Sequence, residues 1–294
     1  MSTGRIGGVV AAIITPVNRA GEPDVPAFVE LATKLLGEGC HGLNVLGTTG
    51  EAVSLGVKQR TEMMQKIGQS PLPLERMMVG TGAAAVTDAV LLTRTAAELG
   101  FAGALVLPPF YYKDVSEEGL CRYIDALVTA TASAPIPIYL YNFPALSGVP
   151  YTRSLVAALK RSFGDRIVGL KDSSGDIDYA AALAARGDID VFPSNEGTLL
   201  RARNGEFAGC ISATANVNAR FCARAFDSGD EIALQVATRI RALFDGKPLV
   251  SGVKSLLAQI HEQPDLARPI PPLVEWSAED TDELFRLYRA IVAG

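Results

Sequence analysis

The chain has 294 residues, of which 48% are hydrophobic and 20% are charged, and its formal net charge is −5. This composition is typical of a globular protein with a large core, and it lacks the basic balance of nucleic-acid-binding proteins. The four cysteines and two histidines have no metal-site spacing. The apolar run at residues 6–17 is too short to span a bilayer. We therefore expect a cytoplasmic protein with no metal, no cofactor and no nucleic-acid or membrane partner.

Short apolar segments alternate with segments of helical spacing along most of the chain. The former predict buried strands at residues 9–15, 42–46, 76–80, 104–107, 136–141, 167–171, 190–192 and 209–212. The latter predict helices at residues 24–37, 56–70, 86–99, 116–132, 152–163, 177–186 and 196–203, and from about residue 217. Continuously apolar strands joined by helices indicate a parallel sheet that is covered on both faces.

Eight such units predict an α/β fold of the (β/α)8 TIM-barrel type. A doubly wound open sheet is the alternative, but no GxGxxG motif follows the first strand. Further helical patterns occupy residues 231–244, 250–260 and 279–292. We therefore predict a catalytic barrel at residues 1–228 and a C-terminal three-helix extension at residues 229–294. The extension should pack on the barrel, with its charged helix faces in solvent.

Lys171 is the first functional signal, because it ends an apolar strand where a polar turn begins. Lysine is rarely buried without a reason. Lys171 is either an ordinary lysine that reaches water or an amine nucleophile that forms a Schiff base with a carbonyl substrate. The second interpretation requires surroundings that favour a neutral amine, such as the apolar mouth of a barrel.

Further polar residues follow other strands at the edge where TIM-barrel active sites form. They are Thr48, Thr49 and Gly50 after the second strand, Tyr111 after the fourth and Tyr141 at the end of the fifth. A phenol can move the protons that imine formation requires. A glycine-rich turn offers backbone N–H groups and hydroxyls to a carboxylate. Together with Lys171, these residues predict a site for a small 2-oxo acid.

Four segments also resemble a known family. GTTGE at 47–51, PFYY at 109–112, YNFP at 141–144 and GLKD at 169–172 resemble the dihydrodipicolinate synthase / N-acetylneuraminate lyase family of class I aldolases. The order and spacing are similar across residues 5–225. The resemblance implies a TIM barrel that acts without a cofactor as a homo-oligomer, either a dimer or a tetramer.

The resemblance also implies roles for individual residues. Lys171 is implied to be the Schiff-base lysine, Tyr141 the proton-relay phenol and Thr48 the relay threonine. Thr49 and the adjoining Gly50 are implied to bind the substrate carboxylate. In the synthase branch, the tyrosine that Tyr111 resembles is lent by a neighbouring subunit. Ile211 resembles the residue whose backbone contacts the pyruvyl group, and Ser173 resembles a position that faces substrate in lyases.

The sequence indicates the substrate less clearly than it indicates the family. The synthase branch has an arginine for aspartate semialdehyde at the place of Leu146, which cannot pair with a carboxylate. Residues 144–149 are similar to the neuraminate-lyase and sugar-acid aldolase branch, but Ala213 stands where the neuraminate lyases have a serine. We therefore expect a lyase that cleaves or dehydrates a hydroxylated 2-oxo acid, such as a 2-keto-3-deoxy sugar acid or 4-hydroxy-2-oxoglutarate.

Two alternatives remain. One is a 4-hydroxy-tetrahydrodipicolinate synthase that condenses pyruvate with aspartate semialdehyde, and the other is a non-catalytic 2-oxo-acid sensor. Ser194, Asn195 and Glu196, which follow the seventh strand, are further candidates for binding substrate hydroxyls. The same three residues suit the cap of the following helix, and the two roles are compatible.

Overall fold

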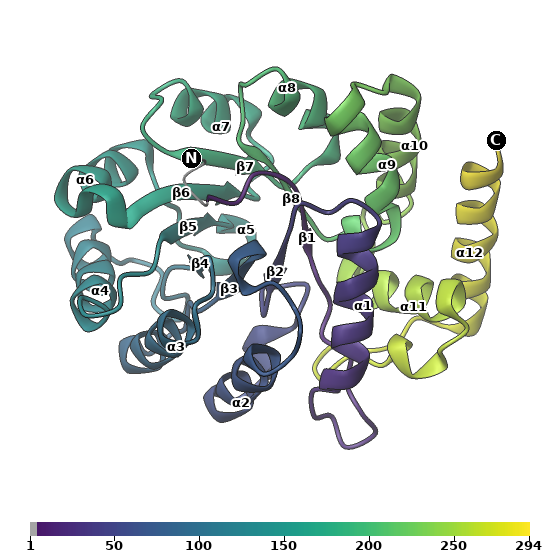
Figure 1. Ribbon diagram of the computed structural model, residues 1–294, viewed down its shortest axis with the longest axis horizontal. Coiled ribbons are helices and arrows are strands. Elements are labelled where there is room, and N and C mark those ends of the chain that lie inside the picture. Colours follow the sequence, from purple (N-terminus) through teal and green to yellow (C-terminus); the bar gives the residue numbers. More distant parts are fainter. Residues whose placement is uncertain (1–4) are drawn as a thin grey trace.

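The computed structural model describes residues 5–294, which form a barrel of parallel strands surrounded by helices (Figure 1). The strands are β1 (Gly8–Ala12), β2 (Gly42–Val45), β3 (Met77–Gly80), β4 (Gly103–Val106), β5 (Ile138–Asn142), β6 (Ile167–Asp172), β7 (Asp190–Pro193) and β8 (Gly209–Ser212). Their order is β7-β6-β5-β4-β3-β2-β1-β8, and every pair is parallel. A hydrogen bond from the Ala208 N–H to the Val191 carbonyl at 3.0 Å brings β8 to β7. The predicted TIM barrel is confirmed.

Helices surround the strands in the order that the sequence predicts. They are α1 (Val25–Gly37), α2 (Val57–Gly68), α3 (Val86–Leu99), α4 (Glu117–Ala130), α6 (Arg153–Phe163), α7 (Ile177–Ala184), α8 (Leu199–Arg203) and α9 (Ala215–Ser228). The short helix α5 (Pro144–Ser147) follows β5 and was not predicted. It begins at Pro144, whose fixed φ suits the first position of a helix.

The final helices are α10 (Glu231–Ala242), α11 (Leu249–His261) and α12 (Ala278–Ala293). They lie on the right of Figure 1, beside α1 and α9. Helix α10 packs on α9, and α11 contacts both α9 and α12. The extension therefore covers one side of the barrel. No described helix combines the length and the apolar character required to cross a membrane.

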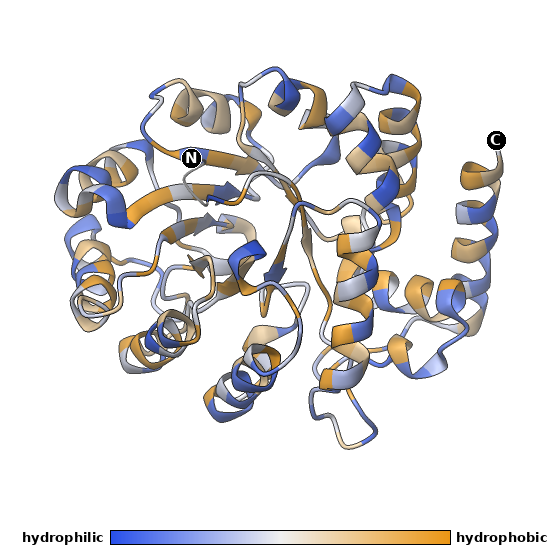
Figure 2. Ribbon diagram, viewed as in Figure 1, coloured by the Kyte–Doolittle hydropathy of each residue, from blue (hydrophilic) through white to orange (hydrophobic). Residues whose placement is uncertain are grey.

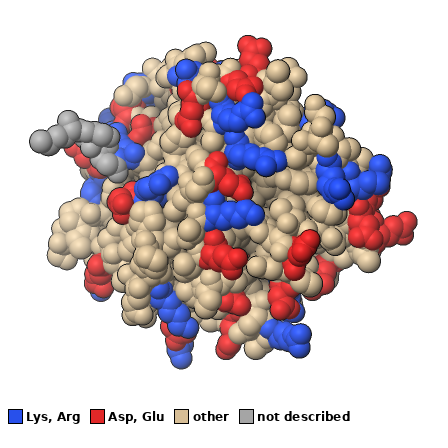
Figure 3. Space-filling view, turned by 45° about the vertical axis from the view of Figure 1, so that its right-hand side comes forward, with Lys and Arg blue, Asp and Glu red and all other residues tan. Residues whose placement is uncertain are grey.

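The strands carry two buried layers, one inside the barrel and one beneath the helices. On β5, Tyr139 and Tyr141 belong to the inner layer, whereas Ile138 and Leu140 belong to the outer one. This alternation follows from the two-residue period of a strand. Figure 2 shows apolar strands at the centre and helices whose apolar residues recur along their length. Acidic and basic side chains are interspersed on the face in Figure 3.

Candidate active site

Lys171 places a buried amine at the carboxyl end of β6. It is paired in register with Tyr141 of β5, so the two side chains start at the same height on neighbouring strands. The Nζ atom of Lys171 lies 4.3 Å from the centroid of the Tyr141 ring. Lys171 is 3% exposed, and none of the salt bridges within residues 5–294 involves it. The side chain is therefore largely buried, and its amine lies beside a phenol without a carboxylate partner.

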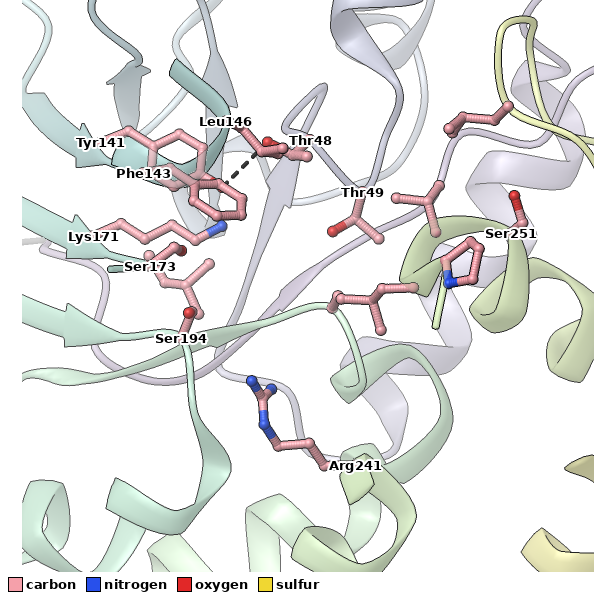
Figure 4. Close-up of a pocket in the computed structure, with 16 residues that line it drawn as sticks. Thr48, Thr49, Tyr141, Phe143, Leu146, Lys171, Ser173, Ser194, Arg241 and Ser251 are labelled. Carbon is pink, nitrogen blue, oxygen red and sulfur yellow. Dashed lines mark hydrogen bonds between the residues drawn. The ribbon is translucent and has the colours of Figure 1, made fainter. Parts of the chain in front are cut away.

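Thr48 extends this arrangement toward β2. Its Oγ1 lies 3.2 Å from the hydroxyl oxygen of Tyr141, and either oxygen can donate the hydrogen bond (Figure 4). Thr49, the next residue, is buried and lines the same cavity. Linked hydroxyls of this kind can move protons to and from a reacting group. The structure therefore brings an amine, a phenol and a threonine hydroxyl together at one end of the barrel.

The turn after β2 has an unusual backbone. Leu46 and Glu51 have φ values of 53° and 54°, in the left-handed region that side chains other than glycine rarely adopt. The carbonyl of Gly50 between them accepts a hydrogen bond from Oγ1 of Thr15 at 2.8 Å. Strained conformations persist where the surrounding structure fixes them. The contacts of this turn therefore hold its threonines in place.

The C-terminal extension holds the far end of the same turn. Glu51 forms an ion pair with Lys254 of α11, and both side chains are fully buried. The Oε2 atom of Glu51 also accepts a hydrogen bond from the backbone N–H of Ile270 at 2.6 Å. Lys254 donates to the carbonyl of Arg268 at 2.9 Å. Burial lowers the pKa of Lys254, and the carboxylate of Glu51 opposes this effect.

A cavity of about 390 Å³ lies at the carboxyl ends of the strands (Figure 4). Its polar lining consists of Thr48, Thr49, Tyr141, Lys171, Ser173, Ser194, Arg241 and Ser251. Its apolar lining consists of Phe143, Leu146, Ile211, Ala213, Pro248, Leu249, Val250 and Leu273. Among the described residues, no aspartate or glutamate lines it. Hydroxyl groups and two basic side chains suit a small, polar, anionic ligand.

The cavity contains most of the site residues that the sequence predicts, namely Thr48, Thr49, Tyr141, Lys171, Ser173, Ser194 and Ile211. Gly50 is buried but lies outside the lining. Tyr111 lies outside it too, is 76% exposed and packs edge-on against Tyr112, with the ring centroids 5.3 Å apart. Asn195 is exposed and caps the helical turn Glu196–Thr198, where its side chain accepts a backbone N–H.

Glu196 is wholly buried and does not line the cavity. Its Oε1 accepts hydrogen bonds from Oγ of Ser212 at 2.7 Å and from Nδ2 of Asn218 at 3.3 Å, and also from Oγ1 of Thr214. Its Oε2 accepts from Nη1 of Arg241 at 3.1 Å. Both carboxylate oxygens are therefore engaged by protein donors.

Asp172 follows Lys171 but also lies outside the cavity lining. Its carboxylate accepts hydrogen bonds from Nδ2 of Asn142 at 2.8 Å and from Oγ of Ser174 at 2.9 Å. Burial raises the pKa of Asp172, and these two hydrogen bonds oppose that shift. The contacts tie the ends of β5 and β6 together and thereby support the pair formed by Tyr141 and Lys171.

Part of the lining was not predicted from the sequence. Arg241 reaches the cavity from α10, residues 248–251 reach it from the start of α11, and Leu273 follows later in the chain. All of them belong to the C-terminal extension, whose charged faces were expected in solvent. Arg241 occupies an ordinary charged position of a helical pattern. No local signal distinguishes it, because its place depends on how α10 packs against the barrel.

Comparisons with known proteins agree with this geometry. Residues 5–291 match the model of the dihydrodipicolinate synthetase family. An uncharacterised DapA-like lyase of Chloroflexus aurantiacus is 33% identical, over 98% of this chain and 97% of its own. A 4-hydroxy-tetrahydrodipicolinate synthase of Coxiella burnetii is 30% identical, over 91% of this chain and 93% of its own.

A solved structure agrees as well. The crystal structure of dihydrodipicolinate synthase from Agrobacterium tumefaciens superposes with a TM-score of 0.90 at 26% identity, covering 97% of this chain and 99% of that one. Both the sequence and the fold are thus shared over nearly the full length of these proteins. The chain belongs to the dihydrodipicolinate synthetase family and is a lyase of the class I aldolase type.

Proposed function

We propose that the chain forms a Schiff base between Lys171 and pyruvate or another 2-oxo acid, and that it cleaves or dehydrates a hydroxylated 2-oxo acid. One observation carries this proposal: the Lys171 side chain is buried, and its Nζ atom forms no salt bridge within the described residues and lies 4.3 Å from the Tyr141 ring centroid. An amine attacks a carbonyl only in its neutral, nucleophilic form.

The first steps form the imine. The lone pair of Nζ attacks C2 of the 2-oxo acid. The carbonyl oxygen takes a proton and Nζ loses one, which gives a neutral carbinolamine. That oxygen then leaves as water after a second protonation, and a protonated imine remains. Tyr141 and Thr48, whose oxygens lie 3.2 Å apart, are the groups that deliver these protons. The turn at Thr48 and Thr49 binds the substrate carboxylate through backbone N–H groups and hydroxyls.

The later steps use the imine as an electron sink. In cleavage, the C4 hydroxyl loses its proton, the C3–C4 bond breaks and its electrons move into the imine, so that an aldehyde leaves. The resulting enamine is protonated at C3, and water hydrolyses the imine to release pyruvate. In dehydration, a proton leaves C3 to give an enamine, the C4 hydroxyl takes a proton and leaves as water, and hydrolysis of the imine releases an unsaturated 2-oxo acid. Both outcomes require the same lysine and the same proton donor.

The residue at position 146 favours cleavage or dehydration over condensation with aspartate semialdehyde. Leu146 is 60% exposed on α5 and lines the cavity, so an apolar side chain stands where the synthase branch is expected to pair with a carboxylate. The synthase remains the second candidate, because one of the relatives described above is named for that reaction. A non-catalytic 2-oxo-acid sensor is a third candidate, and it would bind these acids without a covalent adduct.

Borohydride trapping tests the proposal. We expect incubation with pyruvate and borohydride to add one reduced pyruvyl group to Lys171, detected by mass spectrometry of the proteolysed protein. Lys171→Ala should abolish the adduct. Lys58→Ala, which removes a lysine whose side chain is 88% exposed, is the matched control and should retain it. If no 2-oxo acid gives a Lys171 adduct, the mechanism is rejected and the non-catalytic sensor becomes the remaining candidate.

A substrate panel separates the remaining candidates. Release of pyruvate from 2-keto-3-deoxy sugar acids or from 4-hydroxy-2-oxoglutarate supports cleavage, and formation of a dehydrated 2-oxo acid supports dehydration. Rapid consumption of aspartate semialdehyde together with pyruvate would instead identify a synthase and overturn the interpretation of Leu146.

A further inference from the structure

Arg241 is a second basic side chain in the cavity, and the proposed imine chemistry does not use it. The residue lies on α10, and its side chain is 30% exposed. Figure 4 shows the guanidinium reaching from α10 toward the cavity, on the side of Ser194. Of its donors, Nη1 binds Glu196, whereas Nε and Nη2 have no protein partner within residues 5–294. An arginine has five N–H donors, so most of them are free to bind a ligand.

Glu196 holds this arginine in place rather than competing with a ligand for it. Its carboxylate is buried and accepts from Ser212, Thr214 and Asn218 in addition to Arg241. A buried carboxylate that accepts hydrogen bonds from several donors is satisfied by one N–H group of the arginine and does not need the rest of the guanidinium. The ion pair therefore fixes one edge of Arg241 and leaves its other edge toward the cavity. Such a fixed, planar fork suits bidentate binding of an oxyanion.

The charges of the lining then indicate how many anionic groups the ligand has. Lys171 and Arg241 are its two basic side chains, and no acidic side chain of the described residues lines it. In the proposed function, Lys171 becomes the imine, and the turn at Thr48 and Thr49 takes the carboxylate next to the carbonyl. Arg241 is then left for a different anionic group, at the far end of the substrate.

We propose that Arg241, positioned by Glu196, binds a terminal acidic group of the substrate, so that the natural substrate is a hydroxylated 2-oxo acid with a second anionic end. This inference rests on the proposed function. The second group is a carboxylate or a phosphate, both of which an arginine fork binds. Cleavage of such a substrate releases pyruvate and an aldehyde that carries the second acid. A neutral-ended sugar acid would leave the free edge of Arg241 without a partner.

Trapping with matched pairs of 2-oxo acids tests this inference without depending on turnover. In the first pair, 2-oxoglutarate and 2-oxopentanoate differ only in a terminal carboxylate or methyl group. In the second pair, 2-keto-3-deoxy-6-phosphogluconate and 2-keto-3-deoxygluconate differ in a terminal phosphate. The readout is the concentration of each acid that gives half-maximal Lys171 adduct. We expect the anionic member of at least one pair to act at a concentration about 10- to 100-fold lower, and the favoured pair identifies the group.

Variants assign the preference to Arg241. Arg241→Gln should reduce the preference to about two-fold or less, and Arg241→Lys, which keeps the charge but loses the fork, should keep part of it. Arg239→Gln is the matched control, because Arg239 is an exposed arginine on the same helix, and this variant should keep the full preference. The double variant Arg241→Gln with Glu196→Gln avoids a buried carboxylate without its partner and should also lose the preference.

The possible failures are distinguishable. If the wild-type protein gives no Lys171 adduct with any 2-oxo acid, the proposed function fails. If it forms Lys171 adducts but prefers the anionic member of neither pair, the inference about Arg241 is overturned and the proposed function stands. If a preference exists but survives in both the Arg241→Gln variant and the double variant, the inference is again overturned, because the second anion then binds elsewhere.

Discussion

Tyr141 and Lys171 are register partners on β5 and β6, and the Nζ atom of Lys171 lies 4.3 Å from the centroid of the Tyr141 ring. The phenol hydroxyl points on to Thr48, whose Oγ1 is 3.2 Å away. The ring of Tyr141 therefore covers the amine, while its hydroxyl belongs to a proton path. These two roles of one side chain can be separated, because phenylalanine keeps the ring and lacks the hydroxyl.

Tyr141→Phe should lower the rate of imine formation about 10²- to 10⁴-fold, the usual contribution of a positioned acid or base. The measurement is the rate of borohydride-trapped adduct formation with pyruvate. Tyr139→Phe is the matched control, because Tyr139 is a buried tyrosine on the inner face of the same strand but lies outside the cavity lining. Equal loss of rate in both variants would show that the Tyr141 hydroxyl has no specific role.

Asp172 predicts a pH dependence of stability. Burial raises the pKa of its carboxyl above the ordinary value of 3.8. Between the ordinary and the raised value, the native protein binds more protons than the unfolded chain, so its free energy of unfolding falls as the pH rises through that window. Asp172→Asn removes this titration and keeps an oxygen that can accept from Asn142. The free energy of unfolding of the variant should therefore fall less than that of the wild type as the pH rises from the ordinary pKa of 3.8 through the raised value.

Urea unfolding at a series of pH values above 3.8 measures the difference in the free energy of unfolding. Asp178→Asn serves as the control for the loss of one charge, because Asp178 is exposed on the neighbouring helix α7. Its pH profile should follow that of the wild type. Identical profiles for Asp172→Asn and the wild type would contradict the assignment of the raised pKa to a buried, ionisable Asp172.

Local sequence signals were sufficient for the barrel and for the centre of the candidate site. Lys171 and Tyr141 each end a short apolar strand, and consecutive strands of a (β/α)8 barrel lie next to each other. Once the two strand ends are predicted independently, the fold therefore predicts that the side chains of Tyr141 and Lys171 lie close together. The boundaries were less accurate, since β1 ends at Ala12 rather than at residue 15. Ile13 and Ile14 are fully buried beyond the strand, so hydrophobicity alone could not locate its end.

Contacts between residues far apart in the sequence could not be predicted. Glu51 accepts a hydrogen bond from the backbone of Ile270, which is 219 positions away. No sequence motif near either residue indicates this contact. Arg241 reaches the cavity only because α10 packs on α9 beside the barrel. Glu196 was a candidate for binding substrate hydroxyls, and its burial beneath Arg241 depends on donors from β8 and α9. Such roles follow from tertiary packing, which a single sequence does not display.

The buried pair of Glu51 and Lys254 should support both stability and substrate binding. Lys254→Met leaves the Glu51 carboxylate buried without its cation, which should lower the free energy of unfolding by about 3–5 kcal/mol. Because Glu51 ends the turn that carries Thr48 and Thr49, the variant should also need more pyruvate for half-maximal trapping. Urea unfolding and trapping measure the two effects.

A double variant supplies the control for this pair. Glu51→Gln combined with Lys254→Met removes both charges and should recover a large part of the lost stability, since the cost of the single variant comes from one unpaired buried charge. Lys58→Met replaces an exposed lysine in the same way and should change stability by about 0.5 kcal/mol or less. A loss in the double variant equal to that of Lys254→Met would show that lost packing, not charge, explains the effect.

Tyr111 predicts a shared site in a homo-oligomer. Its side chain is 76% exposed and lies outside the cavity of its own chain, so it can contribute to catalysis only if it enters the site of a neighbouring subunit. Tyr111→Phe and Lys171→Ala should each have low activity alone. Co-expressed in one oligomer, they should regain activity, because a Lys171 site in one chain can receive Tyr111 from the other. Tyr141→Phe co-expressed with Lys171→Ala is the control and should regain none, since those two side chains meet within one chain. Failure of the first mixture to exceed the control, in oligomers shown by mass spectrometry to contain both variants, would place Tyr111 outside the catalytic machinery.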